Sequence, residues 1–111
     1  MYRIPVINQS TLFEDINRNA LVQGKLEILD PVSNNPLTIW SYTDDEYTVM
    51  TNPVILDIEG RVPQTVFCDR IVYVRVYAFK GRDEHNQPIY EFIRDFYAGE
   101  NENSESREYV D

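Results

Sequence analysis

The residues that most often carry out catalysis are scarce in this chain. His85 is its only histidine and stands in the polar run 81–87. Nucleophilic catalysis by serine or cysteine requires a base held rigidly against the attacking group, and a polar loop is poorly suited to hold one. Cys68, the only cysteine, follows Phe67 in an apolar stretch, where a free thiol usually behaves as a small buried hydrophobic group. We therefore expect no catalytic residues and no enzymatic activity.

Two groups of carboxylates could offer oxygen ligands to a hard cation such as Ca²⁺. They are the run 44–46 and the pair Asp57 and Glu59. Neither group has the ligand periodicity of a calcium loop, and both fall where turns are expected. A glycosidase would need two carboxylates across a cleft, for which a chain of 111 residues offers little room. We expect no metal site and no cofactor.

Aromatic residues are abundant, with eight Tyr, five Phe and one Trp. They could stack on sugar rings in a carbohydrate-binding module. They could equally be core and contact residues, because Tyr, Trp and Phe are enriched at protein interfaces. No clustered polar set that would bind sugar hydroxyls accompanies them, so core and interface are favoured. The candidate interface residues are Trp40, Tyr42, Tyr73, Tyr77, Phe79, Tyr90 and Phe92.

The charge balance restricts the partners of the chain. It has 19 Asp and Glu against 10 Lys and Arg, a net charge of −9. Affinity for a phosphate backbone depends on Lys and Arg displacing counterions, so nucleic acid and an anionic membrane surface are not expected partners. A single cysteine allows no intrachain disulfide, which fits assembly in a reducing cytoplasm. Residues 1–10 lack the apolar run of a signal peptide.

The clearest secondary structure is a β-hairpin near the end of the chain. Residues 71–79 alternate small apolar residues with larger ones, and residues 89–97 follow after the polar loop 80–87. Arg75 and Arg94 need carboxylate or carbonyl partners inside such strands. Strict alternation of the second strand places these residues on one face: Tyr90, Phe92, Arg94 and Phe96. The carboxylates nearest in sequence to the two arginines are Glu91 and Asp95.

Further strands are predicted before the hairpin, together with one helical turn. The strands cover residues 25–29, 37–40, 47–50 and 54–56, and the last of these is apolar throughout, as in a strand covered on both faces. Thr11 followed by Glu14 has the spacing of a helix capping box, which predicts one helical turn. The turn after residue 56 combines residues suited to bends. This turn motif consists of Asn52, Pro53, Asp57, Gly60 and Arg61.

These elements predict an all-β domain over residues 1–98. We expect a small antiparallel β-sandwich or two-sheet dome with a long-loop C-terminal hairpin and at most one short helical turn. Residues 99–111 carry five carboxylates and one Arg, a composition that cannot bury enough apolar surface to fold alone. This acidic tail is expected to dock on a partner, with Tyr109 and Val110 as the candidate contacts.

Three blocks in the middle of the chain are familiar in their order. Gly24-Lys25 begins an apolar strand, Pro36-Leu-Thr-Ile-Trp follows, and Pro53-Val-Ile-Leu-Asp-Ile-Glu-Gly-Arg ends the series. The order resembles that of the N-terminal head-binding domain of podoviral tailspikes and related phage fibre-anchoring modules. The similarity covers about residues 12–98, and the closing hairpin of the family corresponds to 71–97.

The resemblance implies an antiparallel β domain that docks a spike or fibre onto other virion proteins: the capsid, the portal or tail components. It implies a homo-oligomer, with a trimer favoured over a dimer, located in a virion that is assembled in the host cytoplasm. Family members continue into a shaft and a receptor-binding or depolymerase domain, whereas this chain stops after the acidic tail. We therefore expect a head- or tail-attached anchor or adaptor that acts by protein–protein contacts. A carbohydrate-binding module for host-surface glycans is the alternative.

Overall fold

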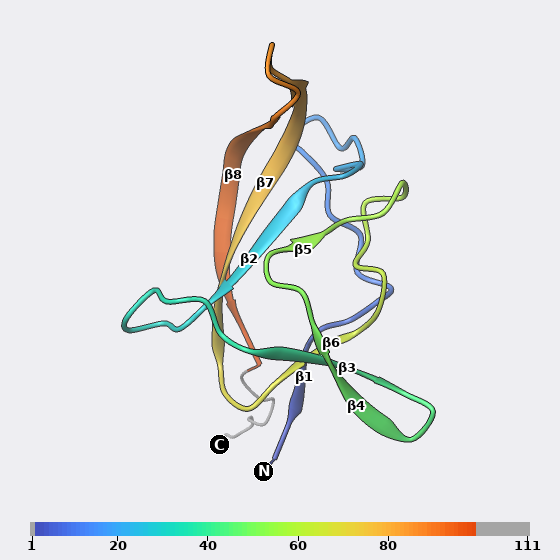
Figure 1. The fold of residues 1–111 in the computed structure, drawn as a ribbon, viewed down its shortest axis with the longest axis vertical. Helices are drawn as coiled ribbons and strands as arrows, with labels where there is room; N and C mark the ends of the chain where they lie inside the picture. Colours follow the sequence, from blue (N-terminus) through green and yellow to red (C-terminus); the bar gives the residue numbers. More distant parts are fainter. Residues whose placement is uncertain (1, 100–111) are drawn as a thin grey trace.

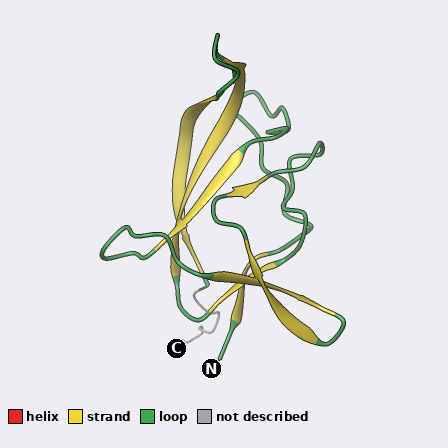
Figure 2. Cartoon of the chain, viewed as in Figure 1, coloured by secondary structure: helices red, strands yellow, loops and turns green. Residues whose placement is uncertain are grey.

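The computed structural model describes residues 2–99, which form eight strands and, within that range, no helix (Figures 1 and 2). The prediction of an all-β fold is confirmed. The strands are β1 (Ile4–Ile7), β2 (Lys25–Leu29), β3 (Ile39–Thr43), β4 (Glu46–Met50), β5 (Val54–Ile55), β6 (Val66–Cys68), β7 (Val72–Arg82) and β8 (Pro88–Ala98).

The strands form two four-stranded antiparallel sheets, in the orders β1-β6-β3-β4 and β5-β2-β7-β8. The second sheet contains the long hairpin β7-β8, which runs along the length of the molecule (Figure 1). Strand β3 of the first sheet runs across the lower end of this hairpin in the same view. The connection from β4 to β5 joins the edge strand of one sheet to the edge strand of the other.

The core is built from the inward-facing residues of both sheets. Successive side chains of a strand point to opposite faces, and in β7 the inner row Val72, Val74 and Val76 is completely buried. Each fully buried side chain of this kind contributes about 1.5–3 kcal/mol to folding relative to an exposed one. The inner rows of the other strands complete one continuous cluster, which includes Leu26, Ile28, Ile39, Val54, Val66 and Cys68.

The predicted helical turn near Thr11 is wrong. The segment forms an isolated β-bridge between Glu14 and Ala20, closed around Asp15. The Asp15 carboxylate accepts the backbone N–H groups of Asn17 at 2.8 Å and Asn19 at 2.9 Å. An Asp side chain that binds nearby backbone groups competes with helix formation, which explains the difference.

Two predicted strands differ in detail. Residues 54–56 are not covered on both faces, because Ile55 is 46% exposed while Val54 and Leu56 are buried. Strand β5 lies at the edge of its sheet, and only its inward-facing side chains are covered by the rest of the molecule. The strand predicted from residue 37 begins at Ile39 instead. The Leu37 N–H donates to the carbonyl of Ile28 in β2, so Leu37 belongs to the connection between the sheets.

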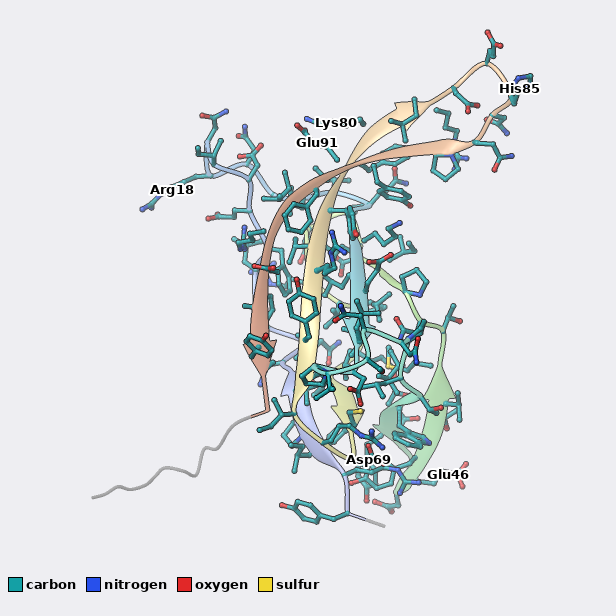
Figure 3. The ribbon with its side chains drawn as sticks, turned by 90° about the vertical axis from the view of Figure 1, so that its left-hand side faces the viewer. Arg18, Glu46, Asp69, Lys80, His85 and Glu91 are labelled. Atoms are coloured by element: carbon teal, nitrogen blue, oxygen red, sulfur yellow. The ribbon has the colours of Figure 1, made fainter. Side chains whose placement is uncertain are left out.

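The C-terminal hairpin is present, and its loop is shorter than the sequence indicates. Strand β7 continues to Arg82 and β8 begins at Pro88. The loop between them is held by Asp83, whose carboxylate accepts the N–H groups of His85 at 2.8 Å and Gln87 at 2.9 Å. Figure 3 shows the tip of the hairpin, marked by His85, projecting beyond the rest of the molecule.

A β-bulge in β8 overturns the strict alternation predicted for this strand. Val76 lies opposite Arg94 and Tyr77 lies opposite Phe92, so Ile93 is an extra residue. The bulge places Phe92 on the outer face beside Tyr77. Phe96 is instead on the inner side, where its ring lies 6.2 Å from that of the buried Phe13.

The carboxylate partners suggested for the two strand arginines are also wrong. Arg94 donates through Nη1 to the carbonyl oxygen of Glu14 at 2.9 Å. Glu91 pairs with Lys80 at 3.2 Å, and the two side chains lie side by side in Figure 3. Asp95 accepts a hydrogen bond from a tyrosine hydroxyl. Arg75 lies opposite Asp95 in the register, but none of the ion pairs within residues 2–99 involves Arg75, and its guanidinium lies over the ring of Phe92 instead.

The turn motif after β5 docks on the loop that carries Phe13. The Asp57 carboxylate accepts the N–H groups of Glu59 at 2.8 Å and Arg61 at 3.1 Å. Gly60 has a φ of 80°, in the left-handed region that favours glycine. Its carbonyl accepts the Phe13 N–H at 2.9 Å, and a Cβ at this position would lie 2.9 Å from the Phe13 carbonyl oxygen. Only glycine therefore allows this close approach.

Asn52, which precedes Pro53, joins three segments through its carboxamide. Its Oδ1 accepts the N–H of Ile28 at 3.2 Å, and its Nδ2 donates to the carbonyls of Ile28 and Leu37, both at 2.8 Å. Strand β5 pairs with β2 only at Lys25 and Leu26. The side chain of Asn52 thus takes the place of a strand neighbour for Ile28, whose N–H would otherwise be buried without a partner.

The acidic tail with Tyr109 and Val110 lies outside the described residues 2–99. Residues 2–99 contain no helix with the length and apolarity needed to cross a membrane.

Replacing Asn52 tests the link between the segments. We expect Asn52→Ala to lower the free energy of unfolding by about 2–4 kcal/mol, because it leaves backbone groups of Ile28 and Leu37 unsatisfied. Asn52→Asp should be at least as harmful, since a carboxylate cannot donate to the two carbonyls. Urea denaturation measures both effects, with the exposed Asn17→Ala as the control. Equal stability of Asn52→Ala and Asn17→Ala would contradict this role.

The turn at Asp57 predicts a dependence of stability on acid. Its hydrogen bonds from the N–H groups of Arg61 and Glu59 lower the pKa of the carboxyl below its ordinary value of 3.8. The stabilisation is therefore complete above that value and is lost as the pH falls through the lower, folded-state pKa. Asp57→Asn keeps an acceptor but does not titrate, so its stability should fall less steeply below about pH 4. Urea midpoints between pH 2 and 7 measure the effect, and parallel curves for the two proteins would contradict it.

Candidate interaction surface

The outer side of the β5-β2-β7-β8 sheet carries three cross-strand pairs of aromatic rings, here called the outer aromatic face. The ring centroids of the pairs are 5.4, 5.8 and 5.9 Å apart. Such offset and edge-to-face pairs are worth about 0.5–1.5 kcal/mol beyond the burial of their area. The pairs are Tyr73 with Tyr97, Tyr77 with Phe92, and Phe79 with Tyr90.

Two features of the sequence place these rings together. Strand β7 puts Tyr73, Tyr77 and Phe79 on the face opposite its buried valines, because side chains alternate along a strand. In β8, the bulge at Ile93 changes the side to which the following residues point. Without it, Phe92 and Tyr97 could not both face outwards while Phe96 faces the core.

Cationic side chains lie across the rings of this face. The Nζ of Lys25, from the neighbouring strand β2, lies 4.6 Å from the ring centroid of Tyr77 and 4.4 Å from that of Tyr90. The guanidinium of Arg75 lies 5.0 Å from the centroid of Phe92. Cation–π contacts at these distances hold the charged groups against the rings. The face is therefore ordered rather than a set of loose side chains.

Two carboxylates on the same face accept tyrosine hydroxyls. Tyr77 donates to Glu27 at 2.8 Å and Tyr73 donates to Asp95 at 2.5 Å. The hydrogen bond to Asp95, and then desolvation, raise the pKa of Tyr73. Burial, and then the bond to Glu27, raise the pKa of Tyr77. Both hydroxyls therefore keep their protons at neutral pH and act as donors.

The remaining predicted interface residues, Trp40 and Tyr42, lie on the other sheet. Tyr42 packs beside Tyr47, with ring centroids 4.8 Å apart, and Arg3 covers Trp40 at 4.4 Å from its ring centroid. The candidate aromatics thus belong to two separate faces rather than to one. Phe67 also belongs to this second group, with its ring 5.4 Å from that of Tyr47.

Several residues of the two faces were missed from the sequence: Lys25, Tyr47, Phe67, Tyr97 and Arg3. For Tyr47 the sequence carries a signal in Asp44 and Asp45, because Asp tolerates the positive φ of tight hairpin turns. Asp44 and Asp45 have φ values of 53° and 63°, as in the two-residue turns that close tight hairpins. A hairpin closed at these two residues places Tyr42 opposite Tyr47. The run of three carboxylates predicts a turn, but by itself it does not fix which residues on either side of that turn are paired.

The residues considered for catalysis and metal binding lie apart from one another. His85 is at the exposed tip of the hairpin, with Nε2 3.4 Å from a carboxylate oxygen of Glu84. Cys68 is fully buried in β6, and desolvation raises the pKa of its thiol. Asp57 is occupied with its own turn. Within residues 2–99, no three His, Cys, Asp or Glu side chains are grouped so that they could hold a metal ion.

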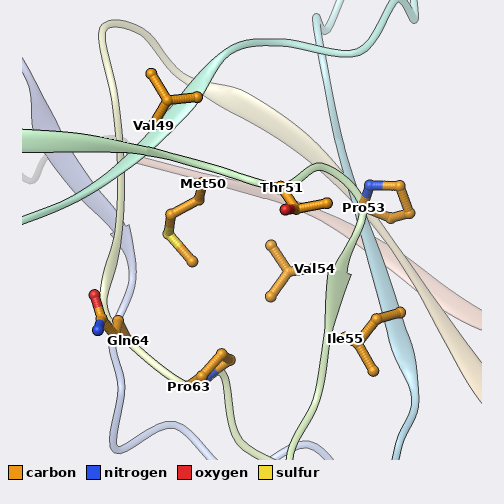
Figure 4. A pocket seen from close by; sticks show the side chains of 8 residues that line it. All are labelled: Val49, Met50, Thr51, Pro53, Val54, Ile55, Pro63 and Gln64. Carbon is orange, nitrogen blue, oxygen red and sulfur yellow. The ribbon is translucent and has the colours of Figure 1, made fainter.

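A groove of about 530 Å³ opens between the edge strands of the two sheets (Figure 4). The end of β4 forms one side of it, and β5 and the loop before β6 form the others. None of its lining side chains is titratable, and most are apolar, so the groove suits apolar groups. The lining residues are Val49, Met50, Thr51, Pro53, Val54, Ile55, Pro63 and Gln64.

The pair Phe79 and Tyr90 lies beyond the last residue of β7 that pairs with β2, which is Tyr77. A two-stranded arm is marginal in water without such cross-strand contacts. A double-mutant cycle with Phe79→Ala and Tyr90→Ala should therefore give a coupling energy of about 0.5–1.5 kcal/mol. Amide hydrogen exchange in the arm measures it. The matched cycle of Phe79→Ala with Tyr97→Ala should be additive, and additivity in both cycles would contradict the prediction.

The outer aromatic face offers ordered rings, two hydrogen-bonded carboxylates and two cations on a rigid sheet. These groups can pack against a partner through the rings and bind it through the charged and hydroxyl groups. No protein-family model matches the chain, and none of the curated proteins matches its sequence.

Proposed function

We propose that the chain is a structural module of a bacteriophage particle, an anchor or adaptor for a head- or tail-attached fibre or spike. It acts by protein–protein contacts and catalyses no reaction. The observation that carries the proposal is the outer aromatic face, in which Phe92 is 45% exposed and Tyr97 is 59% exposed although both are held in ring pairs. Rigid, half-exposed aromatic residues are the usual anchors of protein interfaces.

The energetics favour such a contact. Ordering a flexible side chain on binding costs about 0.5–1.5 kcal/mol. Here the ring pairs and the cations Lys25 and Arg75 are already fixed against one another. A partner that covers Phe92 and Tyr77 gains apolar burial without that cost. The surface is thus prepared for a permanent contact.

The resemblance of the sequence to head-binding domains of podoviral tailspikes supports the virion as the setting. The blocks that carry the resemblance begin β2 at Lys25, lead into β3, and form the turn that follows β5. The partners proposed are capsid, portal or tail components and further copies of the chain, with a trimer favoured over a dimer.

Mass spectrometry of purified phage particles tests the setting, and the chain is expected among the virion proteins in a fixed copy number. Particles assembled without the chain should lack their fibres or spikes and recover them when the wild-type chain is added. Absence of the chain from purified particles would overturn the proposal.

The substitution Phe92→Asp tests the surface. A carboxylate at the centre of the outer aromatic face should reduce incorporation into particles at least tenfold, because it cannot be desolvated without a partner. Ile58→Asp is the matched control, since Ile58 is 78% exposed in the turn after β5, which contributes no ring to the outer aromatic face. Thermal unfolding checks that both variants fold. Equal incorporation of the two folded variants would show that the contact is made elsewhere.

A further inference from the structure

A hollow lies at one end of the outer aromatic face, where the start of β7 and the end of β8 approach the loop after β2. Figure 1 shows this loop standing out from the lower part of the hairpin. The hollow is separate from the groove of Figure 4, since the two share no lining residue. Its lining residues are Pro31, Asn34, Tyr73, Asp95, Phe96 and Tyr97.

Two tyrosine rings form an aromatic wall of the hollow. The centroids of Tyr73 and Tyr97 are 5.4 Å apart and their planes are tilted by 40°. Tyr97 is 59% exposed, so much of its ring surface is available to a ligand. A flat, exposed ring held by a neighbouring ring can pack against another flat apolar surface with little loss of side-chain entropy.

Polar groups with unused hydrogen-bonding capacity stand beside this wall. The Oδ2 atom of Asp95 accepts the Tyr73 hydroxyl at 2.5 Å, which orients the carboxylate and leaves Oδ1 for another donor. Within residues 2–99, the carboxamide of Asn34 takes part in no hydrogen bond. An amide group supplies two donors and an acceptor. The hollow is thus lined by a fixed acceptor and by an amide.

The loop that carries Asn34 is held in place by its own hydrogen bonds. The Asp30 carboxylate accepts the N–H groups of Val32 at 2.8 Å and Ser33 at 3.0 Å. Arg70 pairs with the same carboxylate at 3.1 Å. The Asn34 N–H donates to the Asp30 carbonyl. Asn34 is therefore presented by an organised turn rather than by a loose loop.

The chemistry of the lining selects among ligands. A phosphate or carboxylate is disfavoured, because Asp95 lies in the hollow and the chain has a net charge of −9. A metal ion would find only one carboxylate there. A purely apolar ligand would leave Asp95 and Asn34 without partners, at a cost in free energy. A neutral sugar satisfies both, since a pyranose has an apolar face and hydroxyl groups at its edge.

We infer that this hollow binds a neutral pyranose unit of a glycan. One face of the sugar ring packs on Tyr97, and its hydroxyls donate to Asp95 and accept from the Asn34 carboxamide. The site lies about 13 Å along β7 from Tyr77, the distance expected for four residues of a strand. It therefore adds glycan binding to the proposed function and does not depend on the contact made at Phe92.

Titration of the isotope-labelled, full-length chain with neutral oligosaccharides tests the inference by NMR. The probes are maltopentaose, cellopentaose, mannopentaose and chitotetraose, with oligogalacturonate as the charged comparison. At least one neutral probe should shift the signals of Asn34, Asp95 and Tyr97, and oligogalacturonate should not. Absence of such shifts for every neutral probe at 10 mM (roughly the concentration for contacts of about 3 kcal/mol), or shifts confined to other residues, would overturn the site.

Substitutions then separate stacking from hydrogen bonding for the probe that binds. Tyr97→Ala and Asp95→Ala should each weaken binding at least tenfold, whereas Tyr97→Phe should retain it because the ring remains. Tyr42→Ala, on the other sheet, is the matched control and should have no effect. Unchanged affinity in folded Tyr97→Ala would refute the inference. Phe92→Asp should leave glycan affinity intact, so failure of the sugar site and failure of the virion contact are distinguishable.

Discussion

Strand β7 separates the core from the outer aromatic face, because its successive side chains point to opposite sides of the sheet. Val72, Val74 and Val76 are completely buried on one side, and Tyr73 and Tyr77 form ring pairs on the other. A shift of its register by one residue would bury the tyrosines and expose the valines. The fold and the binding surface therefore depend on the same register, and neither could be changed without the other.

The molecule stabilises its irregular parts with short polar side chains rather than with helices. Asp15, Asp30, Asp57 and Asp83 each accept backbone N–H groups of the turn that follows them. The turns connect the strands, and the core itself is formed by the buried apolar residues of the two sheets. The carboxamide of Asn52 completes the pairing of β2 where β5 ends. Four of the 19 acidic residues of the chain thus hold its turns together.

The bulge at Ile93 decides which aromatic residues are free to meet a partner. It lets Phe92 face outwards and Phe96 pack against Phe13, although the two residues are four apart and would share a face in a regular strand. The ring pair of Tyr77 with Phe92 and the hollow beside Tyr97 lie on opposite sides of this bulge along β8. One inserted residue therefore shapes both proposed binding regions.

The sequence by itself determined the all-β class, the alternation of β7, the hairpin and the strand Lys25–Leu29, because each rests on a local period or on turn residues. Only the tertiary structure decided the bulge, the partners of Arg94 and the division of the aromatics between two sheets, because these depend on which segments meet in space. Trp40 and Tyr77 look alike in the sequence, yet strand order places them on different sheets. Asn34 and Tyr97 show the same limit, since 63 positions separate two residues that line one hollow.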